Sequence, residues 1–339
     1  MTDASRLIVG PAWVGDMVMA HSLVQVLARA KPTAPIDMLA PAWSLPIVER
    51  MAEVRQGIAL AAGHGDIKLG ARRALGQSLR AHGYERAYVL PRSMKAALVP
   101  WFARIPRRTG YRGEFRYGLI NDRRKFVATR LDQTVKRFAN LGLDSDTAAL
   151  EDLPQPALVV DTTAQAEAAA RLDLDLAKPR VALLPGAEYG PAKCWPYGHF
   201  GAVAKALMAA DIAVWILGGP GDVAAANAIA SVAPGVRILC GQTSLTEAID
   251  LLAACPAVVT NDSGLMHVAA AVGSHVVVVY GSSSPDFTPP LTATNDIHYL
   301  NLDCSPCFKR ECPLDHLNCL VQLAPAAVLA SVMAVLGAR

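Results

Sequence analysis

The segment Val259 to Val268, VTNDSGLMHV, joins an apolar run directly to a helical pattern. Asp262, Ser263 and Gly264 lie at the junction, and His267 lies one helical turn further on. A helix that begins here offers unpaired backbone N–H groups and a positive dipole end, which together favour a bound phosphate. Asp262 or Ser263 could equally be a simple helix cap and His267 a packed residue, and the local pattern does not decide between these interpretations.

Two further loops of the same half carry polar groups after apolar runs. Gly186 to Pro196, GAEYGPAKCWP, contains a single lysine, Lys193, whose charge suits a diphosphate. Gly218 to Asp222, GGPGD, ends in a carboxylate that suits a ribose hydroxyl. Taken alone, Lys193 fits a solvated loop residue and Asp222 a helix cap. Taken together, the three loops in this half nevertheless favour a nucleotide as the bound ligand.

In the first half, the segment Trp13 to Met17, WVGDM, places one carboxylate, Asp16, after the first apolar run. A general base must lie within hydrogen-bond reach of the proton it removes, and a strand-end loop is a suitable place for it. The spacing is equally compatible with an N-cap for a helix that begins near Val18.

Four of the seven cysteines fall within sixteen residues, CSPCFKRECPLDHLNC. The opening Cys-x-x-Cys resembles a zinc knuckle, but six residues separate the two cysteines of the second pair and all four lie close together. The pattern leaves a structural metal site and free thiols both open, and disulfides are disfavoured in a reducing compartment. The residues are Cys304, Cys307, Cys312 and Cys319, with His316 among them, whereas Cys194, Cys240 and Cys255 are expected in the core.

Two Asp-x-Asp pairs, Asp144 with Asp146 and Asp173 with Asp175, match the metal-binding carboxylates of some sugar transferases. Neither pair directly follows an apolar strand pattern. We therefore interpret both as surface residues and expect no metal ion in catalysis.

Apolar, β-branched runs alternate with helical patterns along the whole chain, which is typical of parallel βαβ units. The expected strands are 7–9, 36–39, 58–60 and 87–90, and then 181–184, 212–217, 236–239, 258–260 and 276–280. The expected helices are 14–29, 71–81 and 94–102, and then 198–209, 222–232, 245–254 and 265–271.

The two halves open alike, each with an apolar strand, a glycine-containing loop and a helix. A chain of 339 residues with 53% hydrophobic residues is long enough for two such domains. The sequence thus predicts an α/β protein of two doubly wound, Rossmann-like domains that face a cleft, joined by a linker around 152–178.

Charge is distributed unevenly. Residues 1–160 contain 23 Lys and Arg against 14 Asp and Glu, whereas the remainder contains 9 against 15. The densest part, Arg104 to Arg130, has nine basic residues. A basic half usually binds an anionic partner, such as nucleic acid, acidic lipid or a phosphorylated sugar.

The start of the chain lacks the long apolar run of a signal peptide, since Asp16 follows soon after Arg6. Gly273, Ser274 and His275 interrupt the uncharged stretch 263–285, and Pro325 interrupts the uncharged stretch 317–338. Neither stretch therefore suits a membrane span. We expect a cytoplasmic protein.

Several long motifs together resemble the ADP-heptose:lipopolysaccharide heptosyltransferases of glycosyltransferase family 9, and the type II members most. The motifs are PAWVGDMVMAHSL, APAW, YVLPRSMKAALVP, GYRGEFRYGLIND, PGAEYGPAKCWP, TNDSGLMHVAAAVG and YGSSSPDFTPP, and they span nearly the whole chain. The resemblance implies a GT-B fold with an acceptor domain at 1–160, an ADP-heptose domain at 161–322 and a last helix, 323–339, that crosses back to the first domain.

The resemblance also implies roles for individual residues. Asp16 would be the catalytic base and Lys193 the diphosphate contact. Asp262, Ser263, Gly264 and His267 would contact heptose and phosphate, Asp222 the ribose, and the loop with Thr243 and Leu245 the adenine. Because arginine binds carboxylates and phosphates bidentately, the acceptor candidates are Arg92, Lys95, Arg112 and Arg116.

The expected activity is an inverting, metal-independent transfer of heptose from ADP-heptose to the first heptose of the Kdo2-lipid A core. The acceptor would lie at the inner leaflet, so the enzyme would be peripheral to the membrane. The alternatives are heptosyltransferase I, a sugar-nucleotide epimerase, and a non-enzymatic polyanion or RNA binder. An RNA binder needs aromatic stacking platforms, which 6% aromatic residues hardly supply, so we expect no nucleic-acid partner.

Overall fold

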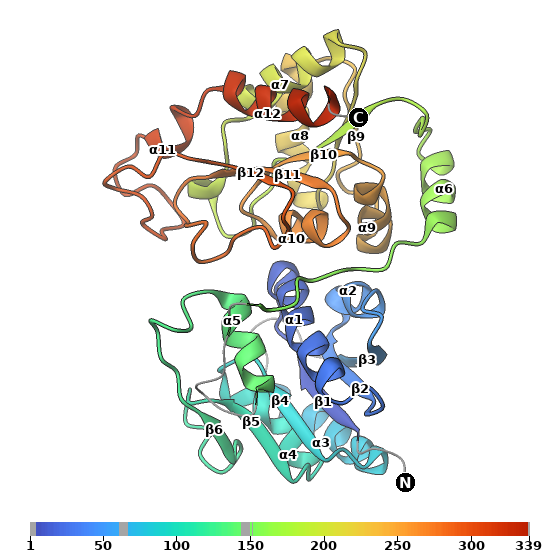
Figure 1. The fold of residues 1–339 in the computed structure, drawn as a ribbon, viewed down its shortest axis with the longest axis vertical. Coiled ribbons are helices and arrows are strands. Elements are labelled where there is room, and N and C mark those ends of the chain that lie inside the picture. The colour runs from blue at the N-terminus through green and yellow to red at the C-terminus, as the bar shows by residue number, and fades with distance from the viewer. Residues whose placement is uncertain (1–4, 61–66, 144–149, 151, 338–339) are drawn as a thin grey trace. The chain divides into compact units, whose positions relative to one another are not determined.

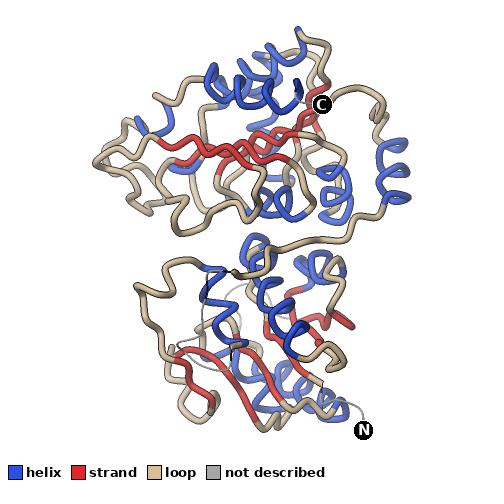
Figure 2. The backbone as a smooth tube through the Cα atoms, in the orientation of Figure 1, coloured by secondary structure: helices blue, strands red, loops and turns tan. Residues whose placement is uncertain are grey.

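The computed structural model describes residues 5–60, 67–143, 150 and 152–337. Their contacts divide the chain into two compact units, Met1–Pro156 and Ala157–Arg339, and Figure 1 colours the chain along its length. Each unit contains one six-stranded sheet with helices packed against it. Figure 2 shows this alternation of strand and helix, which confirms the predicted α/β class with two doubly wound units.

The first unit has a parallel sheet in the order β3-β2-β1-β4-β5-β6. The buried central strand β1 pairs on both sides, with Ile8 opposite Met38 of β2 and Tyr88 of β4. The strands are β1 Arg6–Val9, β2 Ile36–Pro41, β3 Val54–Leu60, β4 Arg86–Val89, β5 Arg107–Tyr111 and β6 Asp122–Arg124. The helices are α1 Val14–Ala30, α2 Leu45–Glu49, α3 Leu69–Ser78, α4 Leu98–Phe102 and α5 Thr134–Ala139.

Helix α1 is tied to the first sheet by the side chain of Arg6 from β1. The Arg6 guanidinium donates hydrogen bonds to the carbonyls of Leu27 at 2.8 Å, Lys31 at 2.9 Å and Ala34 at 2.7 Å. Leu27 lies in the last turn of α1, and Lys31 and Ala34 lie in the turn that follows it, so these bonds fix the end of α1 against β1. The opposite end of α1, where Asp16 lies, is thereby held above the carboxyl edge of the sheet.

The second unit has a parallel sheet in the order β12-β11-β10-β7-β8-β9. Its inner strands form a continuous apolar core with Trp195 and Phe200. The strands are β7 Arg180–Leu184, β8 Ala213–Ile216, β9 Arg237–Ile238, β10 Ala257–Asn261, β11 His275–Tyr280 and β12 Asn295–Tyr299. The helices are α6 Thr162–Arg171, α7 Tyr197–Ala209, α8 Val223–Val232, α9 Leu245–Ala253, α10 Gly264–Ala271, α11 Asn318–Val321 and α12 Pro325–Gly337.

In each sheet, the order in which successive strands are added changes direction once. In the first, β2 and β3 lie on one side of β1, and β4 to β6 lie on the other. In the second, β8 and β9 lie on one side of β7, and β10 to β12 lie on the other. Ligands of open α/β sheets bind at such switch points, beyond the carboxyl ends of the strands. The loops after β1 and β4, and those after β7 and β10, are therefore the expected ligand-binding loops.

Three strands have no counterpart in the sequence-based expectation. Strands β5 and β6 lie in the basic stretch, and β12 is a polar edge strand. The Asp122 carboxylate of β6 accepts hydrogen bonds from Arg86 and Arg107, both at 2.9 Å. Part of the positive charge in this region is thus neutralised within the sheet and does not reach a ligand.

The last helix, α12, packs on α7 and on the strands β10 and β11 of its own unit. The role predicted for it, crossing back to the first domain, stays a prediction. Among the described helices, none is both long enough and apolar enough to cross a bilayer. The stretch 263–285 instead forms α10 and β11, and 317–337 contains α11 and α12.

Candidate functional site

The loop that carries Lys193 is anchored at both ends by one buried amide. The Asn261 side chain, at the end of β10, accepts a hydrogen bond from the Trp195 backbone N–H at 2.9 Å and donates to the Pro185 carbonyl at 2.7 Å. Trp195 is itself buried, and its indole donates to the Leu323 carbonyl at 3.0 Å. Sequence reasoning missed Asn261, although its place directly before Asp262 was a signal for it.

Lys193 and Asp262, predicted separately as ligand contacts, form an ion pair with Nζ and Oδ2 2.5 Å apart. The side chains are 18% and 5% exposed, and the Thr288 hydroxyl donates to the other carboxylate oxygen at 3.4 Å. The Lys193 ammonium also lies 5.2 Å from the centre of the Tyr189 ring. An ammonium has three donors, so this pairing holds the lysine in place and leaves donors for an anion.

Helix α10 begins at Gly264 with Ser263 as its N-cap. The Ser263 hydroxyl accepts a hydrogen bond from the Met266 backbone N–H at 3.3 Å. The capping role and the phosphate-binding role are compatible, because one cap satisfies only one of the unpaired N–H groups in the first turn. The end of α10 therefore presents N–H groups directly beside the Lys193–Asp262 pair.

His267 is buried in α10 and carries no charge at neutral pH. Burial lowers the pKa of His267 to about 4, while Asp262 raises it and Lys193 lowers it further. Within the described part of the chain, its Nδ1 has no hydrogen-bond partner. His267 can therefore exchange a hydrogen bond with a ligand but cannot supply a positive charge.

The stability of the protein is expected to fall in acid because of His267. Between its pKa of about 4 in the folded protein and its ordinary value of 6.5, only the unfolded chain takes up the proton. Lowering the pH from 7 to 5 should therefore cost about 2 kcal/mol through this residue. Urea unfolding at both pH values checks this, and His267→Gln should lose less stability than the wild type over the same range. An equal loss in both proteins would contradict the assignment.

The side chain of Asp222 lies against the loop after β7. Its Oδ2 accepts the Gly219 backbone N–H at 2.8 Å, and a Cβ atom at Gly186 would lie only 2.3 Å from its Oδ1. The loops after β7 and β8 therefore approach closely only because residue 186 is glycine. Asp222 is half-buried and precedes α8, so the structure places it at the same edge as Lys193.

Thr243 and Leu245 lie beyond β9 at the beginning of α9. Ser244 is the N-cap, and its side chain and that of Glu247 form a reciprocal capping box. Thr243 and Leu245 are both half-buried. Their contact with adenine stays a prediction.

In the first unit, Asp16 lies in the first turn of α1. The helix begins at Val14 with Trp13 as the N-cap residue, so Asp16 is not the cap of a helix that begins near Val18. A carboxylate in this turn is stabilised by the positive end of the helix. Asp16 is half-buried and lies close enough to Arg137 of α5 to act on its charge.

Two arginines lie against the ring of Phe126 in the same unit. The guanidinium groups of Arg92 and Arg137 lie 5.3 and 5.2 Å from the centre of its ring. Arg92 also donates to the Arg112 carbonyl at 3.3 Å, so the exposed Arg92 and Arg112 lie side by side. Burial and Arg92 lower the pKa of Arg137, whereas Asp16 is among the groups that raise it. Sequence reasoning missed Arg137, which lies outside the basic stretch and in no motif.

Two of the predicted acceptor contacts are less accessible. Arg116 is buried and donates to the carbonyls of Pro91, at 2.7 Å, and Tyr111. Burial lowers its pKa to about 10, with Arg92 acting in the same direction. Lys95 is half-buried in the short helical turn after β4. Arg116 therefore shapes the loop between β5 and β6 rather than presenting its charge at the surface.

Among the described residues, no three His, Cys, Asp or Glu side chains stand together in positions that already coordinate a metal ion. Asp173 has a φ of 52° just after α6, and Asp175 accepts the Ala177 N–H at 2.8 Å, as in a turn. Asp144 and Asp146 lie outside the described residues.

A family model described as glycosyltransferase family 9 (heptosyltransferase) matches residues 72–318. The chain belongs to this family. Lipopolysaccharide heptosyltransferase 2 of Escherichia coli strain K12 is 42% identical over 340 residues, which cover 97% of this chain and 98% of that protein. Lipopolysaccharide heptosyltransferase 2 of Salmonella typhimurium is 46% identical over 296 residues, which cover 84% of this chain and 85% of that protein.

A solved structure shows the same relationship in three dimensions. The "Structure of E. coli ADP-heptose lps heptosyltransferase II" matches with a TM-score of 0.88 at 40% identity and covers 98% of both chains. The chain is thus a family 9 glycosyltransferase with two doubly wound units, as the motifs predicted. The family match includes Lys193, Asp262 and His267, whereas Asp16 and α12 lie outside it.

Proposed function

We propose that this glycosyltransferase moves L-glycero-D-manno-heptose from ADP-heptose to the first heptose of the Kdo2-lipid A inner core. The observation that carries the proposal is the Lys193–Asp262 pair beside the first turn of α10, at the switch point of the second sheet. This arrangement suits a diphosphate. The names of the full-length relatives, lipopolysaccharide heptosyltransferase 2, support heptose as the sugar.

The donor would bind to the second unit. Lys193 and the N–H groups at Ser263 and Gly264 would contact the diphosphate, and His267 the heptose or its phosphate. Asp222 would accept a hydrogen bond from the ribose, and Thr243 and Leu245 would flank the adenine. As the bond between the anomeric carbon and the diphosphate oxygen breaks, charge develops on the leaving ADP, where Lys193 and α10 stabilise it. This division of work requires no metal ion or other cofactor for catalysis.

The acceptor would bind to the first unit. Its hydroxyl oxygen attacks the anomeric carbon from the face opposite ADP, which inverts the configuration, and Asp16 takes the hydroxyl proton. Arg92, Lys95, Arg112 and Arg137 would contact the acid groups of Kdo and the lipid phosphates, with Arg116 supporting the loop. Bidentate arginine contacts suit these planar and tetrahedral anions.

Product analysis tests the proposal and separates it from its alternatives. Purified protein is incubated with ADP-heptose and mono-heptosylated Kdo2-lipid A, in parallel with Kdo2-lipid A that lacks heptose, and in EDTA with and without added magnesium. The proposal expects a second heptose on the first acceptor only, and equal rates with and without EDTA. Transfer to the acceptor without heptose would indicate a heptosyltransferase I, and turnover without acceptor an epimerase. Loss of activity in EDTA that magnesium restores would overturn the metal-free chemistry.

Removing the exposed arginines should affect the acceptor and not the donor. Arg92→Ala with Arg112→Ala should raise KM for the acceptor at least tenfold, because each lost bidentate contact to an anion weakens binding by about 1.5–3 kcal/mol. ADP binding by calorimetry should not change. Arg123→Ala, an exposed arginine on β6, is the matched control. Equal loss of acceptor and ADP binding would contradict the assignment of substrates to units.

The proposed location is the cytoplasm, peripheral to the inner membrane. The loop between β5 and β6 exposes Phe115 by 90% and Tyr117 by 77%, next to the exposed Arg112. Aromatic and basic side chains together favour the surface of an anionic bilayer. Phe115→Ser with Tyr117→Ser should lower the fraction of protein that floats with phosphatidylglycerol vesicles several-fold. Ile297→Ser, an exposed apolar residue on β12, should leave it unchanged, and equal flotation of all three proteins would refute the contact.

A further inference from the structure

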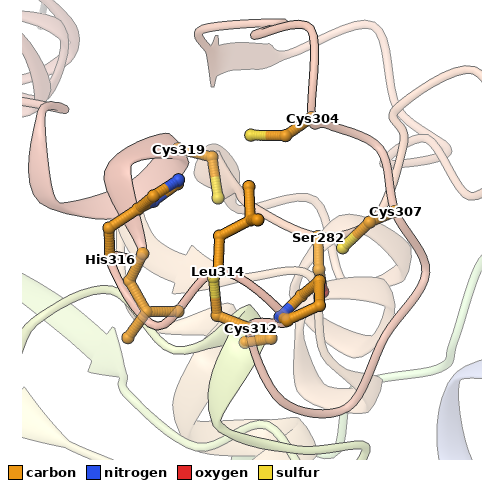
Figure 3. Close-up of a pocket in the computed structure, with 10 residues that line it drawn as sticks. Ser282, Cys304, Cys307, Cys312, Leu314, His316 and Cys319 are labelled. Atoms are coloured by element: carbon orange, nitrogen blue, oxygen red, sulfur yellow. The ribbon is translucent and has the colours of Figure 1, made fainter.

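Four cysteines from one stretch of chain line a single small cavity in the second unit. Figure 3 shows Cys304, Cys307, Cys312 and Cys319 around it, with the sulfurs of Cys304, Cys307 and Cys319 pointing inward. The cavity has a volume of about 20 Å³. This is room for about one water-sized sphere, and so for a single ion.

The hydrogen bonds of one of these four, Cys312, differ from those of the other three cysteines of the chain. Cys194, Cys240 and Cys255 each donate S–H to a backbone carbonyl, at 3.8, 3.6 and 3.5 Å, as protonated core thiols do. By contrast, the Cys312 sulfur accepts hydrogen bonds from the backbone N–H groups of Leu314, His316 and Leu317. Backbone N–H groups that point at a cysteine sulfur are typical of sulfurs that bind metal ions.

The remaining groups at the cavity agree with a site made of four cysteines. All seven cysteines lie in the described part of the chain, and all are free thiols. His316 also lines the cavity, but its Nδ1 accepts the Asn318 N–H at 3.0 Å. The four thiols are thus the natural ligand set, and side-chain rotation can bring them to bonding distance.

We propose that Cys304, Cys307, Cys312 and Cys319 hold one tetrahedral divalent metal ion, zinc by the preference of four thiolates, and that this ion fixes the loop of Lys193. Zinc takes four cysteine sulfurs at about 2.3 Å in closed structural sites. The ion has no part in the transfer reaction itself. Its effect on Lys193 rests on the proposed function, whereas its binding does not.

The cysteine segment is joined to the Lys193 loop by two hydrogen bonds to its backbone carbonyls and by one close approach. The Ala192 N–H donates to the Arg310 carbonyl at 3.0 Å, and the Tyr189 hydroxyl donates to the Phe308 carbonyl at 2.8 Å. A Cβ atom at Gly190, where φ is 154°, would lie 2.5 Å from the Arg310 carbonyl oxygen. Only glycine permits this approach, so the two segments move together and an ion that orders one also orders the other.

Metal analysis of the purified full-length protein tests the binding. Mass spectrometry of the metals after desalting, in the presence of a reductant, should find one equivalent of metal per chain, zinc above iron. Cys304→Ser with Cys307→Ser should lose it, and the single variant Cys304→Ser should weaken its retention against a chelator. Cys255→Ala, which removes a core thiol, should keep it. Cobalt in place of zinc should give a thiolate-to-cobalt charge-transfer absorption.

Three outcomes would overturn the binding proposal: wild-type protein without stoichiometric metal even after incubation with zinc, metal retained by the double variant, or a disulfide within the cluster. If the purified protein binds the metal but transfers no heptose, the proposed function is wrong and the metal-binding proposal still holds.

The positioning role needs a separate measurement. Loss of the ion should weaken ADP binding about tenfold in the wild type and hardly at all in Lys193→Ala, because coupled residues are not additive. Equal weakening in both backgrounds would show that the ion stabilises the fold without acting through Lys193.

Discussion

Replacing Lys193 by alanine is expected to lower kcat/KM for ADP-heptose by about 10²–10³, the usual effect of removing one donor that stabilises charge in the transition state. The Lys193 ammonium is held in place by Asp262 at 2.5 Å and lies beside the first turn of α10. Its contribution is expected to grow as the diphosphate of the leaving group takes up negative charge. Steady-state kinetics at saturating acceptor measure the effect, with Lys205→Ala, an exposed lysine of α7, as control.

The same substitution also leaves Asp262 buried without its cation, which destabilises the fold. A double variant, Lys193→Met with Asp262→Asn, separates the loss of charge stabilisation in the transition state from the loss of fold stability. Together these changes remove both charges, so thermal stability should recover towards the wild-type value while kcat/KM stays low. Recovery of kcat/KM along with stability, or an unchanged kcat/KM in Lys193→Ala, would place Lys193 outside the donor site.

The strands that the sequence predicts best are those buried on both faces. The runs that form β1, β10 and β11 are continuous and apolar because helices cover both sides of a parallel sheet. Strands β5 and β6 escape this rule because their charged residues pair within the sheet: Asp122 of β6 accepts hydrogen bonds from Arg107 of β5 and from Arg86 of β4. A polar strand stabilised by contacts distant in sequence has no local hydrophobic pattern to reveal it.

The candidate site shows the same limit. The loops after β7, β8 and β10 are visible in the sequence, because glycine and a polar residue follow each apolar run. That Lys193 and Asp262 pair with each other depends on β7 and β10 being neighbours in the sheet. Likewise, nothing local distinguishes the buried Arg116 from the exposed Arg112, or brings Arg137 to Asp16. The residue types predict which chemistry the site can perform, whereas the side chains that pair with one another are determined by the order of the strands in the sheet.

Asp16→Asn is expected to lower kcat by about 10²–10⁴, the range for loss of a general base. Asparagine retains the shape of the side chain but cannot accept the proton of the attacking hydroxyl. Asp16 lies in the first turn of α1, which Arg6 anchors at its other end, so the substitution should not disturb the helix.

Two measurements make the Asp16 prediction specific. ADP binding should persist in Asp16→Asn, because the donor contacts are assigned to the second unit, and the loss should therefore appear in kcat and not in the affinity for ADP. Glu53→Gln is a matched control, since this carboxylate of the same unit pairs with the buried His21 at 2.7 Å, away from the carboxyl edge of β1. Its kcat should stay within a few-fold of the wild type. Near-normal turnover by Asp16→Asn would defeat the mechanism, because among the described residues no other carboxylate lies in the loop after β1 or in the first turn of α1.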